Sequence, residues 1–329
     1  MNKLDWQYQT HLRARYLFEQ MEEMLRSAPN EEEKRQFLSS PDNYYLRKLN
    51  EIYTDDFQLA ILMDKSDVLF HAEGDAASHD APELSAVSWL TKVAQASFRK
   101  ISRSYLSKHL DSIDLSSAIK KIDFRFNGYA PGSIYLGFSV EDSDESGFHF
   151  QEEGNPIVQI RHIIKSLSDI PGYIVNNHVD KKAILELIDD PAMRDTALQV
   201  SYDLSPTGRS GIDELSVANS ERRKGTFTQV TKRYFKEAIA NPMSHGLSKG
   251  SFFGEIREID LDKERFELRG VKQIGSIRCI KPKSLSGRDL IGEFCKVTGS
   301  YEVDKNGRPS LMMVDEISIE KPKQKDMDM

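Results

Sequence analysis

The sequence predicts a mixed α+β protein with a helical N-terminal region, a central α+β domain and a C-terminal five-stranded barrel. Apolar residues recur at helical spacing through most of the first hundred residues. Clear alternation of apolar residues begins near residue 116, and short strands separated by turns dominate after residue 250. A length of 329 residues fits two or three domains of roughly 100–200 residues each.

Residues 1–115 are expected to be mainly helical. In the first helix, over residues 4–25, apolar residues recur at helical spacing: Leu4, Tyr8, Leu12 and Tyr16, then Leu17, Met21, Met24 and Leu25. Shorter helices are expected over residues 31–38 and 40–53. A long helix is predicted to start at a cap of Asp80, Pro82 and Glu83 and to run to about His109.

Residues 56–63 allow two interpretations. Phe57, Leu59, Ile61 and Met63 alternate, which is typical of a strand that pairs with residues 68–71. The Leu, Ala and Met content favours a helix instead. The hairpin is the preferred interpretation.

The central domain is expected over residues 116–242. A hairpin joins residues 121–126 to 133–140 through a turn that begins with Asn127 and Gly128. Three helices follow, over residues 156–167, 180–188 and 191–200. A strand over residues 212–217 and a helix capped by Thr226 or Thr228 complete the domain.

The barrel is expected over residues 250–321, after a linker over 241–250 that contains proline and glycine. Five strands are predicted over residues 251–260, 265–269, 274–280, 296–303 and 311–319, with a helix over 285–294. In arrangement alone this segment resembles an OB-type or SH3-like barrel, and OB folds often bind oligonucleotides or oligosaccharides. A charged tail over residues 322–329 is expected to be disordered.

Charge and motif content exclude several function classes. The net charge is −7, and it divides into −5 for residues 1–117, −3 for 118–245 and +1 for 246–329, so any nucleic-acid surface must be local. The chain has no P-loop, no dinucleotide-binding glycine motif and no zinc-protease or serine-hydrolase motif, so no cofactor or metal site is predicted. Cys279 and Cys295 are expected in the core. No membrane-spanning or signal segment is apparent, which favours a cytoplasmic location.

Two groups of basic residues are candidate nucleic-acid contacts. The first group, which we call the basic cluster, is interleaved with Phe227, Tyr234 and Phe235 and consists of Arg222, Arg223, Lys224, Lys232, Arg233 and Lys236. The second lies on or beside the second and third strands of the barrel and consists of Arg265, Arg269, Lys272 and Arg278. Basic side chains neutralise phosphates and aromatic rings stack on bases, so both groups point to single-stranded nucleic acid.

Arg103 and His109 are a candidate catalytic pair. The segment from Arg103 to His109 resembles a short pattern in a family of helical RNA-cleaving proteins, where an arginine and a histidine act on the scissile phosphate. Six residues along a helix turn through about 600°, so the two side chains would point about 120° apart.

The sequence is therefore compatible with three functions. The leading hypothesis is a non-enzymatic nucleic-acid-binding protein that uses local basic surfaces. The alternative is a protein-interaction or assembly subunit of a bacterial multi-component system, with a protein partner docked on the N-terminal helices. The third is a ribonuclease that uses Arg103 and His109.

Overall fold

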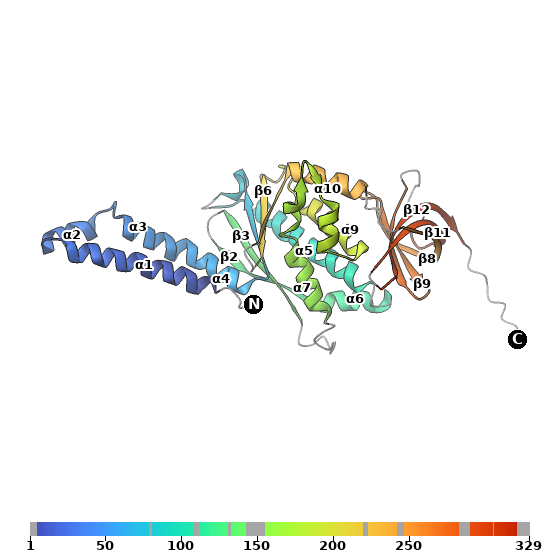
Figure 1. Ribbon diagram of the computed structural model, residues 1–329, viewed down its shortest axis with the longest axis horizontal. Helices are drawn as coiled ribbons and strands as arrows, with labels where there is room; N and C mark the ends of the chain where they lie inside the picture. The colour runs from blue at the N-terminus through green and yellow to red at the C-terminus, as the bar shows by residue number, and fades with distance from the viewer. Residues whose placement is uncertain are drawn as a thin grey trace.

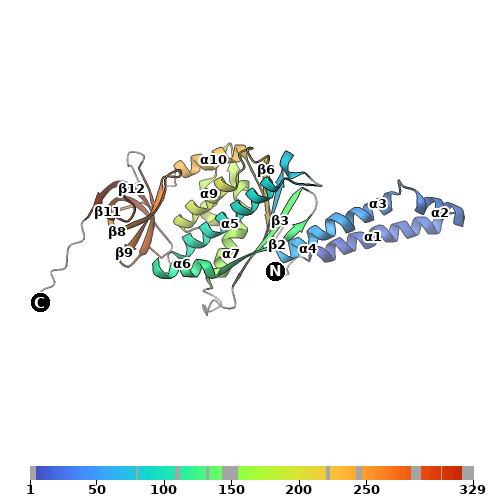
Figure 2. The same ribbon diagram turned by 180° about the vertical axis from the view of Figure 1, so that it is seen from behind.

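The computed structural model describes residues 5–78, 81–107, 112–130, 133–142, 155–219, 223–241, 247–282, 290–304 and 306–320. The chain forms an elongated molecule in which a helical arm, a central domain and a barrel follow one another (Figure 1). Seen from behind, the central sheet lies on the side of the arm and the central helices lie on the side of the barrel (Figure 2). The predicted α+β class with a C-terminal five-stranded barrel is confirmed.

The arm is a pair of antiparallel helical segments. Its outgoing helix is α1 (Trp6–Ser27), and a short α2 (Glu31–Ser39) lies at the tip. The returning segment comprises α3 (Tyr44–Glu51), a π-helical turn (Ile52–Asp56) and α4 (Phe57–Lys65). The carboxylate of Asp64, near the end of α4, accepts hydrogen bonds from the backbone N–H groups of Trp6 and Gln7 at 2.9 and 3.1 Å, which ties the start of α1 to the end of the returning segment.

The expected strand over residues 56–63 is wrong, because these residues lie in the π-helical turn and α4. Leu59, Leu62 and Met63 then share one side of the helix and pack against Leu69 and Ala130 of the sheet. Gly137 permits this close approach, since a Cβ atom there would lie 2.6 Å from Leu62 Cδ1. Tertiary packing therefore overrides the alternating pattern.

The central sheet has five antiparallel strands in the order β2-β3-β1-β6-β7. The strands are β1 (Val68–Glu73), β2 (Ile122–Ala130), β3 (Ile134–Asp142), β6 (Glu214–Asn219) and β7 (Lys224–Thr228). The expected β2–β3 hairpin is present, and β2 continues through Gly128 with an irregular register. Strand β7 was not predicted from the sequence. A separate two-stranded ribbon is formed by β4 (Ile174–Val175) and β5 (His178–Val179).

Helices cover the sheet face that lies opposite the arm. They are α5 (Leu84–Leu106), α6 (Ser112–Lys121), α7 (Pro156–Ser166), α8 (Lys181–Leu187), α9 (Pro191–Leu204) and α10 (Gln229–Ala240). Their apolar sides and the sheet form one core that includes Phe70, Phe98 and Phe138. Helix α5 begins at Leu84 without a side-chain cap from Glu83, and both Asp80 and His109 lie outside the described residues.

The barrel is closed by five strands in the order β10-β12-β11-β8-β9. These are β8 (Ser248–Asp260), β9 (Arg265–Val271), β10 (Gly275–Ile280), β11 (Phe294–Val303) and β12 (Pro309–Ile319), with β10 and β12 parallel and the other pairs antiparallel. The helix expected over 285–294 falls largely outside the described residues, and Phe294 opens β11 instead. The expected tail over 322–329 also lies outside them.

The barrel has its own hydrophobic core, separate from that of the central domain. Its fully buried members include Ile256, Leu268, Ile277 and Val297, together with Cys279. The domain boundaries expected from the sequence stay predictions. In the part of the chain that the structure describes, no helix is both long and apolar enough to cross a membrane.

Candidate functional site

A buried carboxylate lies at the centre of the contact between the central helices and the barrel. Asp195 of α9 is 5% exposed, and its Oδ1 accepts hydrogen bonds from Nε and Nη2 of Arg265 at 3.1 and 2.8 Å. Its Oδ2 lies 2.9 Å from Nε of Arg278 and accepts a 2.6 Å hydrogen bond from Gln199. One carboxylate on α9 thus binds two arginines, from β9 and β10 of the barrel.

Electrostatics hold this carboxylate in its charged form. Burial acts to raise the pKa of Asp195, but the guanidinium groups of Arg265 and Arg278 and the hydrogen bonds outweigh it. The net result is a pKa below the ordinary value of an aspartate. The buried charges are therefore mutually compensated, as buried charges must be to avoid a large desolvation cost.

Further ion pairs surround the central one, and they run in both directions across the contact. Arg194 of α9 pairs with Glu302 of β11, and both side chains are buried. Lys263, between β8 and β9, lies 2.5 Å from Asp203 of α9. Because each domain supplies both signs of charge, the contact fixes a specific orientation of the barrel rather than a general attraction.

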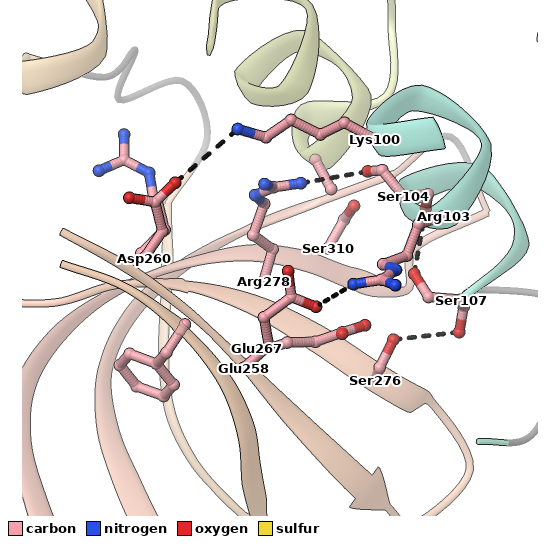
Figure 3. Close-up of a pocket in the computed structure, with 13 residues that line it drawn as sticks. Lys100, Arg103, Ser104, Ser107, Glu258, Asp260, Glu267, Ser276, Arg278 and Ser310 are labelled. Atoms are coloured by element: carbon pink, nitrogen blue, oxygen red, sulfur yellow. Dashed lines mark hydrogen bonds and ion pairs between the residues drawn. The ribbon is translucent and has the colours of Figure 1, made fainter. Parts of the chain in front are cut away.

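A small pocket of about 80 Å³ lies in this contact, between α5 and the barrel strands (Figure 3). Charged side chains enter it from both sides, and all of them have partners. Arg103 binds Glu258 at 2.9 Å, and Arg278 donates to Ser104 at 3.2 Å. Figure 3 shows these pairs, together with the 3.8 Å pair of Lys100 and Asp260.

Lys100 is the one lysine among the described residues that line the pocket, and the pKa of its amine is lowered. Burial, reinforced by the nearby charge of Lys263, lowers the pKa of Lys100 from 10.5 to about 8, although the carboxylate of Asp203 opposes the shift. A buried amine with this pKa exchanges its proton near neutral pH. Each cation among the described residues of the pocket wall is already paired with a carboxylate or a hydroxyl of the protein.

The structure places two of the barrel's four candidate contacts inside this domain contact. Arg265 is 3% exposed and Arg278 is mostly buried, and both are bound to Asp195. Arg269 pairs with Glu267 at 2.6 Å, while Lys272 is exposed at the end of β9. These four residues do not form one exposed surface.

The basic cluster is brought together only in part. Arg222 lies outside the described residues, and Arg223 pairs with Asp169 at 2.9 Å. Lys232 donates to the carbonyl oxygens of Tyr202 and Ser205 at 2.7 Å each, and burial lowers its pKa.

Four described members of the basic cluster are exposed: Arg223, which pairs with Asp169, Lys224 on β7, and Arg233 and Lys236 on α10. Of the interleaved aromatic residues, Phe227 and Phe235 are fully buried in the core. The available cationic surface is therefore smaller than the sequence suggests.

The catalytic pair is not assembled in the described residues. Arg103 points into the pocket and binds Glu258 of the barrel. His109 lies outside the described residues, so its role with Arg103 stays a sequence prediction.

The arm concentrates exposed apolar side chains, and four of them, Tyr8, Leu12, Tyr16 and Met24, are among the apolar positions that the sequence places on the first helix. Among residues 5–56, the buried apolar side chains are Ala14, Met21 and Ile52. Of the 22 large apolar residues that are exposed in the described parts of the chain, the same stretch holds nine: Tyr8, Leu12, Tyr16, Phe18, Met24, Leu38, Tyr44, Leu46 and Tyr53. The breadth of the apolar surface of α1 indicates this exposure in the sequence, because its apolar residues occupy more of the helix than one neighbouring helix can cover.

Comparisons with models of protein families, with curated proteins and with solved structures find no match for this chain.

We expect the Asp195→Asn variant to lower the free energy of unfolding by about 3–5 kcal/mol, because it leaves two buried guanidinium groups without a counter-charge. The Glu258→Gln variant is the matched control. Its ion pair with Arg103 is about half exposed, so it should cost under about 1 kcal/mol. Urea unfolding of both variants measures the difference, and equal costs would contradict the central role of Asp195.

We expect the Lys100→Met variant to be more stable than the wild type at pH 7, by up to about 3 kcal/mol, because the pKa of Lys100 falls from 10.5 to about 8 and each unit corresponds to about 1.4 kcal/mol. The folded pKa lies below the unfolded one, so the folded state binds fewer protons between about pH 8 and 10.5. Wild-type stability therefore gains a rising contribution across that window, and the advantage of the variant should shrink. Unfolding curves at pH 7 and pH 10 test this, and a pH-independent difference would contradict it.

Proposed function

We propose that the protein is an assembly subunit that docks a protein partner through its N-terminal arm. The observation that carries this proposal is the composition of the arm surface, which exposes nine large apolar side chains over residues 5–56. Tyr8, Leu12 and Tyr16 lie in one row of this surface, at intervals of four residues along α1, and large exposed apolar patches mark interaction sites in folded proteins.

Simple packing rules support this function. A helix with an apolar face must bury that face against another element, and stable domains need at least two packed layers around a core. The two helical segments of the arm cover only one side of each other, and few of their side chains are buried. Most helical stability in proteins comes from such packing, so a third element would stabilise the arm.

The position of the arm also suits a docking role. It projects from the body, and the barrel lies at the opposite end (Figure 1). Because buried ion pairs fix the barrel on the central domain, a partner bound to the arm would be held in a defined position relative to the barrel.

A photoreactive amino acid at position 16, in place of Tyr16, should form covalent adducts with a protein in cells that produce the full chain. The same group at Leu261, an exposed apolar position between β8 and β9, should form none. Adding Leu12→Asp beside the probe should abolish the adducts, because a carboxylate in an apolar contact is costly to desolvate. Absence of adducts at position 16 would contradict the docking function.

A second candidate function is the binding of single-stranded nucleic acid by the exposed part of the basic cluster. It is favoured by Arg233 and Lys236, which are both exposed on α10, and by Arg233 lying 6.0 Å from the ring centre of Tyr234. Phosphate contacts of this kind carry no sequence information and weaken steeply with salt.

Replacing Arg233 and Lys236 together by glutamate should weaken binding to a single-stranded oligonucleotide and flatten the log–log salt slope by about 1–2 units, since each lost phosphate contact contributes about 0.7. Lys272→Glu, on an exposed barrel position outside the cluster, is the control and should leave the slope unchanged. Fluorescence anisotropy at several salt concentrations measures both. No binding by the wild type at low salt would rule out this second function.

A further inference from the structure

We propose that the partner of the arm is a second copy of the same chain, with the two α1 helices packed antiparallel across a two-fold axis. This inference rests on the docking function of the arm and names its occupant. Closed two-fold dimers are the commonest assemblies of soluble proteins, and their interface must be self-complementary. Three features of α1 meet that requirement.

The first feature is a continuous ridge along the exposed side of α1. Tyr8, Leu12, Tyr16, Gln20 and Met24 follow one another at intervals of four residues, which places them in one row on the helix surface. The three aromatic and aliphatic side chains nearest the body are exposed, and Gln20 donates a 2.8 Å hydrogen bond to the Tyr16 hydroxyl. Such rows are the elements that interlock when two helices pack.

The second feature is an open hollow of about 870 Å³ at the tip of the arm, where α1, α2 and α3 meet. Met24, Leu25, Phe37 and Tyr45 give it an apolar lining, and Glu23 lies at its edge among other polar residues. The hollow can receive bulky apolar side chains, which the body-side half of the ridge supplies. In an antiparallel pair, the tip of one arm meets the body-side half of the other.

The third feature is the distribution of charge along α1. Residues 6–16, next to the body, contain Arg13 and Arg15 and no acidic residue. Within the chain Arg13 pairs with Asp56 and Arg15 with Glu19, each at 2.8 Å, but both arginine side chains are more than half exposed. Residues 17–27, toward the tip, contain three glutamates, Glu19, Glu22 and Glu23, against Arg26. Antiparallel helices therefore place opposite charges side by side, whereas parallel helices would place like charges together.

These features also define a register. If the ridge at Leu12 enters the hollow beside Met24 of the other copy, the two-fold axis crosses α1 at the level of residue 18, midway between the two along the helix. Arg13 then lies opposite Glu23 of the other copy. The two bodies lie at opposite ends of the paired arms.

Cysteine crosslinking of the purified full chain tests the register. The native Cys279 and Cys295 are buried and free, so an introduced thiol is the accessible one. A mixture of Leu12→Cys and Met24→Cys chains should form a disulfide-linked dimer on mild oxidation, because a disulfide needs Cα atoms within about 7 Å. Leu12→Cys alone should not crosslink, since its two copies would be about 18 Å apart along the helix.

Charge reversal tests the complementarity by sedimentation. Glu19→Arg with Glu23→Arg should weaken self-association at least tenfold, because α1 becomes basic along its whole length. Adding Arg13→Glu and Arg15→Glu to that variant should restore the dimer, because the gradient is then reversed but again complementary. The Tyr53→Ser variant is the matched control. It removes an equally exposed tyrosine from the arm outside the ridge, so it should leave the dimer intact.

The outcomes separate this inference from the docking function on which it rests. A monomeric wild-type chain that still forms adducts with another protein at position 16 would overturn self-pairing and leave arm docking in place. A chain that neither self-associates nor forms adducts would overturn both. Crosslinks between two copies of Leu12→Cys would overturn the antiparallel arrangement.

Discussion

The carboxylate of Asp195 is the interaction on which the arrangement of the body depends. It binds arginines from two neighbouring strands of the barrel, and it lies on a helix that is buried along most of its length. A buried charge of this kind contributes little net stability when paired, but it strongly disfavours any arrangement that leaves it unpaired. The barrel and the central helices are thereby held in one orientation, although their hydrophobic cores are separate.

This constraint explains why the site residues were only partly predictable. The sequence around Arg265 and Arg278 does not reveal whether these arginines bind a phosphate or a carboxylate of the same chain. The carboxylate that they meet is 70 residues distant from Arg265 in the sequence and sits in a helix with no unusual local pattern. Local reasoning finds the cations but not their partner. The barrel surface that looked open to a ligand is instead occupied by α5 and α9.

The fold itself was more accessible, because periodicity and capping are local. The barrel strands, the β2–β3 hairpin and the Thr228-capped α10 lie close to their expected positions. The wrong or missed secondary-structure predictions occur where tertiary packing, rather than local sequence, determines the secondary structure. Residues 57–65 are helical because Leu59, Leu62 and Met63 reach the sheet together, and β7 was missed because its five residues, which include Gly225, are too few for a clear alternation.

In the arm, the sequence of α1 contains more apolar residues than the contacts within one chain bury. Along α1, one set of apolar residues, including Ala14 and Met21, packs against the returning segment. The other set, centred on Leu12 and Tyr16, faces solvent. A helix with two apolar faces is typical of a position between two neighbours. The single chain supplies one neighbour for α1, and the charge distribution along the helix is the reason for proposing a second copy as the other.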